Sequence, residues 1–176
     1  MPGIALLLAL LGAPAALPGW TRHALPSELS VELPAAAERR HTERGVVVGR
    51  VVSDTVVSTW EDGWAAATIT HVPRIALGLA GRAGVERRAR DEILADHDAT
   101  AESWTEVRRA GLEGRALTFS TRGAQGQPQR GRAEIFTWED KVLTVTAVVD
   151  LAAPEVDRVF GSLRRGEASR APSDPR

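Results

Sequence analysis

The sequence contains no cysteine in its 176 residues. This absence excludes disulfides, thiolate nucleophiles, zinc–thiolate sites and lipid attachment at an N-terminal cysteine, and it is compatible with the cytosol and with an oxidising compartment alike. Lysine is nearly absent too, since Lys141 is the only one and arginine carries the remaining positive charge. The net charge is −1, with acidic and basic residues interspersed, so the sequence lacks the electrostatic footprint of a nucleic-acid-binding protein.

A long hydrophobic run is also missing, because the apolar stretch Ile4–Leu11 is shorter than the ~20 residues that a bilayer-spanning helix needs. Gly-Ala-Pro follows this stretch, and Ala13-Pro14-Ala15 fits the small-x-small pattern of a signal-peptidase site. We therefore expect residues 1–15 to be a cleaved signal peptide, the mature protein to begin at Ala16, and its location to be periplasmic or secreted. No Lys or Arg precedes the run, and a buried N-terminal helix is the alternative.

The rest of the chain is long enough for one domain with a sizeable core. With 43% apolar and 26% charged residues, its composition is that of an ordinary globular protein. Alternating residues in Ser27–Pro34 predict a strand with one buried face, and the polar stretch that follows indicates a connection. The β-branched run Gly45–Ser53 predicts a further strand. We place a single α+β domain at residues 27–165 and a disordered tail at residues 166–176.

The tetrapeptide T-W-E-D occurs twice, at Thr59–Asp62 and at Thr137–Asp140, each time between two β-prone runs. Thr and Trp favour strands and Asp tolerates turn geometry, so both copies are interpreted as hairpin turns rather than as a duplicated functional motif. The strand after the second copy shows the clearest alternation in the chain and is predicted to be half-buried. Its apolar face consists of Leu143, Val145, Ala147 and Val149, and its polar face carries Thr144 and Thr146.

The pattern changes after Pro73, where Val85, Ala89 and Ile93 recur every four residues and predict an amphipathic helix up to Asp96. Glycine inside a helix costs about 1 kcal/mol relative to alanine. We therefore expect a weak or broken helix in the segment that holds Gly78, Gly81 and Gly84.

A second helix is predicted near the end of the chain, between Pro154 and Gly166, two residue types that suit the first turn of a helix and its termination. Its apolar residues follow helical spacing and are Val156, Val159, Phe160 and Leu163. The order of strands, helix, strands and helix predicts an α+β fold with a central, mostly antiparallel sheet flanked by helices.

One stretch concentrates side chains that could bind a metal, because six acidic or histidine residues lie within twelve positions. They are Asp91, Glu92, Asp96, His97, Asp98 and Glu102. A metal site needs at least three convergent ligands, whereas Arg87, Arg88 and Arg90 alongside favour a solvated helix end with ion pairs. We expect no metal site here.

His71 is the sharpest candidate for catalysis, since it shares a strand face with Ala65, Ala67 and Ile69 and is expected to be half-buried. A catalytic histidine needs a carboxylate and a nucleophile beside it, and no hydrolase motif is present, so a structural role is favoured. The three glycines after residue 77 do not meet the conditions of a dinucleotide-binding or phosphate-binding loop. We expect no catalytic residue and no cofactor.

Five segments together resemble small exported bacterial proteins of the PsbP-like fold, a superfamily that includes the photosystem II extrinsic protein P. They read SELSVELP, THVP, GLEGRALTF, RAEIFTWEDKVLTVTAV and DRVFGSL, and the resemblance covers about Ser27 to Arg165. Val159 and Leu163 stand where such proteins tend to carry aromatic residues. The resemblance implies an antiparallel sheet between helices and mostly non-catalytic roles in binding or assembly.

These observations favour an exported, non-enzymatic binding or assembly module of the bacterial cell envelope, expected to be a monomer with an envelope protein or a small ligand as its partner. The alternative is a carrier of a small ligand or lipid, with an apolar pocket lined by tryptophan between sheet and helix. A hydrolase that uses His71 is less favoured. Because tryptophan at strand ends suits interaction surfaces, Trp60, Trp64 and Trp138 are the candidate interaction residues, with burial at the edge of the core as the alternative.

Overall fold

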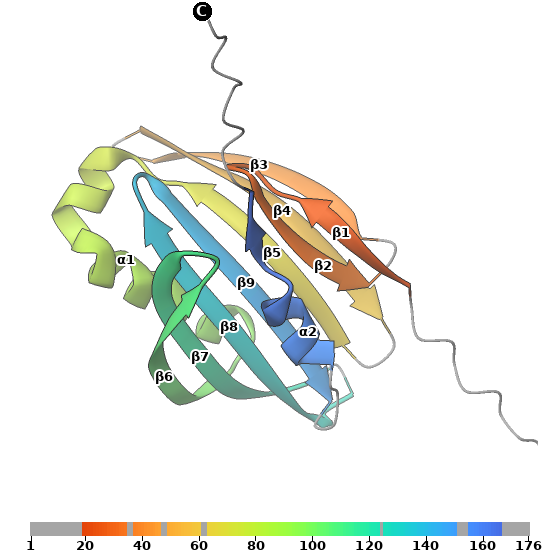
Figure 1. Cartoon of the computed structure of the whole chain (residues 1–176). Coiled ribbons are helices and arrows are strands. Elements are labelled where there is room, and N and C mark those ends of the chain that lie inside the picture. The colour runs from red at the N-terminus through yellow and green to blue at the C-terminus, as the bar shows by residue number, and fades with distance from the viewer. Residues whose placement is uncertain are drawn as a thin grey trace, which may run out of the picture.

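Ten strands and two helices make up the described part of the chain, residues 19–34, 37–46, 49–60, 63–123, 125–150 and 155–166 of this computed structural model (Figure 1). In chain order they are β1 (Trp20–Ala24), β2 (Leu29–Pro34), β3 (Glu38–Val46), β4 (Gly49–Trp60), β5 (Gly63–His71), α1 (Arg74–Asp96), β6 (Thr100–Arg109), β7 (Leu112–Arg122), β8 (Pro128–Trp138), β9 (Lys141–Asp150), α2 (Glu155–Gly161) and β10 (Arg164–Arg165). Neither of these helices combines the length and the apolar content that crossing a membrane requires.

The strands form two antiparallel sheets. The large sheet has the order β3-β4-β5-β9-β8-β7-β6, and the small sheet has the order β1-β2-β10. Neighbours in the large sheet are consecutive in sequence except at the β5–β9 pair, where Gly63 faces Val149 and His71 faces Lys141. Helix α1 makes this pairing possible, because it carries the chain from the end of β5 to the edge strand β6.

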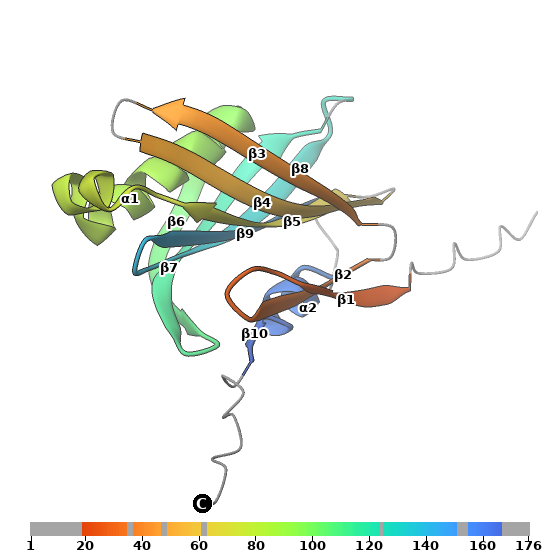
Figure 2. The same cartoon turned by 90° about the horizontal axis from the view of Figure 1, so that it is seen from above.

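The large sheet is covered on both faces by different elements (Figure 2). Helix α1 lies over one face, where its second half packs on a cluster that we call the helix-side core. The buried members of this cluster are Ile93, Leu117, Phe119, Ala133, Ile135, Val142 and Val148. The small sheet and α2 lie on the opposite face, so the molecule has three layers.

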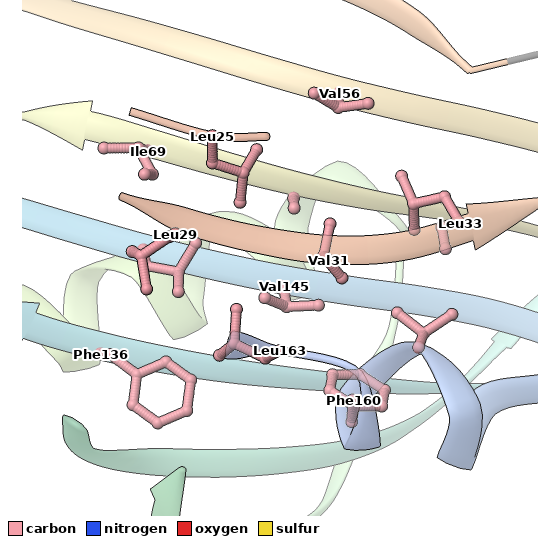
Figure 3. Packing of buried hydrophobic residues seen from close by; sticks show 14 of the residues in the cluster. Leu25, Leu29, Val31, Leu33, Val56, Ile69, Phe136, Val145, Phe160 and Leu163 are labelled. Carbon is pink, nitrogen blue, oxygen red and sulfur yellow. The ribbon is translucent and has the colours of Figure 1, made fainter. Parts of the chain in front are cut away.

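A larger cluster, the inter-sheet core, fills the space between the two sheets (Figure 3). Strand β2 supplies Leu29, Val31 and Leu33, each at most 2% exposed. Strands β4, β5, β8 and β9, helix α2 and the residues just after it supply most of the rest: Val56, Ala65, Ala67, Ile69, Phe136, Leu143, Val145, Ala147, Val159, Phe160 and Leu163. Burial of apolar surface stabilises by roughly 25 cal/mol per Å², so this cluster contributes much of the driving force for folding.

The predicted α+β class, the mostly antiparallel sheet and both hairpin turns are confirmed, since Trp60 pairs with Gly63 and Trp138 pairs with Lys141. The strand at 29–34 is confirmed as well. The description of a sheet flanked by helices holds only in part, because α2 shares its face of the large sheet with the small sheet. The predicted signal peptide at residues 1–15 and the tail beyond Gly166 lie outside the described residues.

The sequence analysis did not predict three of the strands. The polar stretch predicted to be a connection is the edge strand β3, whose described side chains from Glu38 to Arg44 are exposed on both faces and therefore show no apolar alternation. Strand β1 lies before the predicted domain start and is also largely exposed, and β10 has only two residues. A strand at the edge of a sheet needs no buried face, so periodicity does not reveal it.

Strand β9 is more deeply buried than predicted. Val142 and Val148 belong to the helix-side core, while Leu143 and Val145 belong to the inter-sheet core. Even Thr146, on the predicted polar face, is only 6% exposed. The reason is position, because β9 lies between β5 and β8 in the middle of the sheet and both of its faces are covered.

Helix α1 is interrupted as its glycines predict. Gly81 has φ 65° and ψ 166°, values outside the helical region, so α1 consists of two segments that meet at a kink. The second segment supplies the residues that pack on the helix-side core, namely Val85, Ala89, Ile93 and Leu94. The first segment, from Arg74 to Ala80, contributes none to that core.

We predict that Gly131→Ala destabilises the protein by about 1–3 kcal/mol, the usual cost of overpacking a core. Gly131 faces Phe119 across β7 and β8, and a Cβ built on it would lie 2.1 Å from the buried ring. The matched control is Gly78→Ala, which meets nothing within 4 Å and should stabilise the helix by about 0.5–1 kcal/mol. Urea unfolding of both variants tests the prediction, and equal stabilities would contradict it.

Candidate functional site

The three candidate tryptophans are half-buried and do not form one surface. Trp60 and Trp138 pack against the inter-sheet core, whereas Trp64 packs against the helix-side core on the opposite face. The strand register also places Trp60 and Trp138 at opposite ends of the large sheet, since β5 runs from the end near Trp60 to the end near Lys141. Each ring therefore covers an edge of the core locally.

The second T-W-E-D turn is hydrogen-bonded to the segment between β5 and α1. Lys141 Nζ lies 3.2 Å from a Glu139 carboxylate oxygen and 3.0 Å from an Asp140 one, and its hydrogen bond lowers the pKa of Asp140. The backbone N–H of Val72 donates to the Asp140 carbonyl at 2.8 Å. These contacts fix the turn and its neighbour and fully account for this copy of the motif.

The acidic stretch after Arg90 is engaged in ion pairs. Arg90 contacts Asp91 at 2.7 Å, Arg88 contacts Glu92 at 3.0 Å, and Arg130 contacts Glu102 at 3.4 Å. In the part of the chain that the structure describes, no three of its histidine and acidic side chains converge in a way that could hold a metal ion. Arg88 and Arg90 therefore form the ion pairs that the sequence analysis expected at this end of the helix.

His97 belongs to an aromatic cluster rather than to the solvated end of α1. Its ring lies parallel to that of Phe119 with centroids 6.1 Å apart, and it is tilted against Trp64 at 5.1 Å. Burial lowers the pKa of His97 and outweighs the opposing effect of Asp96. Desolvation among these rings therefore disfavours the charged form of His97.

His71 is half-buried at the end of β5, as predicted. No carboxylate among the described residues forms a hydrogen bond with its ring, so the pairing that a catalytic histidine requires does not occur there. The sequence analysis missed a different histidine–carboxylate pair, His41 Nδ1 and Asp54 Oδ1, 2.8 Å apart across β3 and β4. Both side chains of this pair are exposed near the edge of the sheet.

A polar cluster buried against α2 was also missed. Glu134 is 0% exposed, and both of its oxygens accept hydrogen bonds from Arg109, at 2.6 and 2.8 Å, while Arg132 donates to one of them at 2.6 Å. These bonds raise the pKa of Arg109. Arg132 also lies 4.6 Å from the Phe160 ring and 3.4 Å from Asp157, so the cluster ties β6 and β8 to α2. A buried carboxylate needs such pairing, which makes this cluster structural.

A broad cleft of about 580 Å³ lies between α1 and the strands β6 and β7. We call it the charged cleft, because six of its nine lining residues are charged. Helix α1 lines it with Arg82, Ala83 and Glu86, β6 with Glu106, Val107 and Arg108, and β7 with Glu113, Gly114 and Arg115. Its volume is that of a ligand pocket, but its lining is polar and contains no tryptophan.

Positive and negative side chains are paired throughout the charged cleft. Arg82 Nε contacts Glu86 Oε1 at 2.9 Å, and the same guanidinium donates to the backbone carbonyl of Glu113, which ties α1 to β7. Glu86 is 5% exposed and forms the floor. On the rim, the exposed pairs are Arg108 with Glu113 and Arg115 with Glu106, the latter at 3.3 Å.

These pairs have consequences for binding. An exposed ion pair contributes only about 0–1 kcal/mol to stability, so a partner that offers charged groups of its own could replace one at little cost. The cleft is thus suited to polar recognition rather than to holding an apolar molecule. The sequence carried no signal for it, because α1, β6 and β7 each contribute ordinary surface arginines and glutamates.

We predict that the free energy of unfolding decreases as the pH falls from about 7.5 to 5.5. Burial lowers the pKa of both His97 and His23, so below about pH 6.5 the unfolded chain binds protons more readily than the folded one. His97→Gln should remove part of this decrease, and His23→Gln a further part. Denaturant unfolding at a series of pH values tests the prediction, and an identical pH dependence in His97→Gln would contradict it.

No protein-family model matches the sequence, and no curated protein matches it significantly. Among solved structures, cyanobacterial PsbP (CyanoP) from Synechocystis sp. PCC 6803 is similar, with 12% identity and a TM-score of 0.54 over 89% of this chain and 99% of that chain. A protein from Bacteroides thetaiotaomicron has 13% identity and a TM-score of 0.43 over 84% of this chain and 48% of its own. A Pseudomonas aeruginosa protein of unknown function has 13% identity and a TM-score of 0.38 over 78% and 88%.

Identities this low concern the fold alone, and only the first structure is similar enough to support an argument. Its match extends over nearly the whole of both chains and covers the antiparallel sheet that the sequence resemblance led us to expect. The chain therefore has a PsbP-like fold.

Proposed function

We propose that the protein is an exported, non-enzymatic binding or assembly module of the bacterial cell envelope, and that it contacts a partner protein through the charged cleft. The observation that carries this proposal is the paired set of arginines and glutamates around an open cleft. Non-obligate protein interfaces have polar rims, and arginine is enriched in them. The resemblance to PsbP-like proteins supports a role in binding or assembly.

The location in the envelope rests on the sequence. The apolar run Ile4–Leu11 and the small residues at Ala13 and Ala15 are typical of a cleaved export signal. Intact-mass measurement on protein from the envelope fraction of the native host should give a chain that begins at or near Ala16. Full-length protein confined to the cytosol would contradict export.

A small charged ligand is the second candidate, because the charged cleft has the volume of a ligand pocket and lies between helix and sheet. An apolar ligand such as a lipid is less favoured. The space between the two sheets is filled by the inter-sheet core, and the charged cleft exposes carboxylates and guanidinium groups that an apolar molecule could not satisfy. A hydrolase that uses His71 has less support still, since that ring lacks a carboxylate partner within the described residues.

Photo-cross-linking in the native host tests the use of the charged cleft. A benzophenone amino acid at position 108, on the rim, should give a discrete protein adduct, whereas the same group at position 165, on β10, should not. The double variant Glu106→Arg with Arg115→Glu keeps the internal ion pair and the net charge but reverses the pattern that a partner meets.

We expect this reversal to abolish the adduct from position 108 and to leave the melting temperature nearly unchanged, because exposed pairs contribute about 0–1 kcal/mol. An adduct that survives the reversal, or one that forms equally from position 165, would contradict the proposal. A small molecule that co-purifies with the wild-type protein and not with the reversed variant would favour the second candidate.

A further inference from the structure

Two large aliphatic side chains are exposed on the first segment of α1. Leu79 is 82% exposed and Ile75 is 63% exposed, and no other large hydrophobic side chain among the described residues is comparably open to solvent. They are four residues apart, so they lie on the same side of the helix, one turn from each other. The residues between them are small or partly buried: Ala76, Leu77 and Gly78.

The kink at Gly81 is what leaves this pair uncovered. The second segment of α1 packs on the helix-side core, whereas the first segment turns away and lies at the end of the large sheet (Figure 2). Neither Ile75 nor Leu79 belongs to either core. Their exposure is therefore a property of the fold and not of a frayed helix end.

The exposed pair adjoins the charged cleft. Leu79 precedes Arg82 and Ala83, which line the cleft, by three and four residues, a span of at most about 14 Å of chain. The molecule thus presents an apolar spot beside a rim of arginines and glutamates. Protein–protein interfaces have this composition, with an apolar centre and a polar periphery.

We infer that the aliphatic pair Ile75 and Leu79 and the charged cleft form one docking surface for a partner protein. The partner segment would place apolar side chains on the pair and charged side chains of both signs in the cleft. This inference rests on the proposed function and specifies the chemistry of the partner.

A lipid bilayer is a less favoured occupant of this surface, because two aliphatic side chains provide little membrane affinity. One myristoyl chain, with fourteen carbons, gives only marginal membrane binding, on the order of 10⁴ M⁻¹. Two aliphatic side chains bury fewer carbons than that chain. Among the surrounding cations, Arg82 is paired with Glu86, Arg50 with Glu43, and Lys141 with Glu139 and Asp140. Arg74 is exposed and pairs with no described carboxylate, but a single arginine near an anionic membrane surface contributes only about 1 kcal/mol.

A second copy of this chain is a weaker occupant on grounds of area. The first segment of α1 has seven residues and is about 10 Å long at 1.5 Å per residue. Two such segments side by side bury far less than the roughly 1,200 Å² of a stable interface. A partner protein that also enters the charged cleft can bury a larger area.

Photo-cross-linking at position 79 tests the inference in the full-length protein in its native host. The expected result is an adduct with the same protein that position 108 captures, and peptide mapping should place both links in one segment of it. Lipid adducts alone, a link to a second copy of this chain, a different protein, or no adduct at position 79 would each overturn the inference. If position 79 gives no such adduct but position 108 still cross-links to a protein, the inference fails and the proposed function survives. If neither position cross-links, the inference and the proposed function both fail.

Affinity for the protein captured at position 108 gives the quantitative test. Leu79→Ser and Ile75→Ser should each weaken binding on the order of tenfold, because each removes buried aliphatic carbon from the interface. Both should leave the melting temperature unchanged, since neither side chain is in a core. The matched control is Ala101→Ser, an exposed position on β6, which should bind like the wild type. Unchanged affinity in both aliphatic variants would overturn the inference.

Discussion

The central strands of the large sheet have buried side chains on both faces, and the rest of the fold depends on covering both. Strand β9 has buried side chains on each side, and β5 and β8, its neighbours, also contribute to both cores. A sheet of this kind exposes too much apolar surface to be stable alone. The small sheet with α2 covers one face, and the second segment of α1 covers the other.

This division explains where the surface features lie. Polar contacts also bind the elements that cover the inter-sheet face. Glu134 accepts hydrogen bonds from Arg109 and Arg132 near α2, and Arg158 of α2 lies 3.3 Å from Glu32 of β2. Among the described helices, the segment of α1 after Gly81 is the one that packs on the helix-side core. The first segment of α1 and the charged cleft take no part in either covering layer, and they form the docking surface that we propose.

The sequence predicted those elements that have a buried face. Alternation identified β2 and β9, the spacing of Val85, Ala89 and Ile93 identified the second segment of α1, and the glycines before them predicted its kink. It did not predict β3, because an edge strand with solvent on both sides has no periodic pattern. The PsbP-like fold followed from a resemblance of core and turn patterns and is supported by the comparison with cyanobacterial PsbP.

The candidate site was harder to predict, for a physical reason. Trp60, Trp64 and Trp138 attract notice because large aromatic residues at turns suit an interface, yet their rings lie against two different cores. The charged cleft combines side chains from residues 82–115 whose individual neighbours in sequence are unremarkable. These side chains come together because α1 packs across β6 and β7. Local sequence patterns carry no information about such a tertiary arrangement.

Native-state hydrogen exchange tests the central claim most directly, namely that the second segment of α1, without the first, covers the helix-side face of the large sheet. Amides of β5 and β9 should exchange through global unfolding, and those from Val85 to Asp96 should exchange at a comparable or slightly lower free energy of opening. Amides from Gly78 to Ala80 should exchange through a much smaller, separate opening. If both segments of α1 opened together with the sheet, the first segment would be part of the covering layer, and the account of a free docking surface would be wrong.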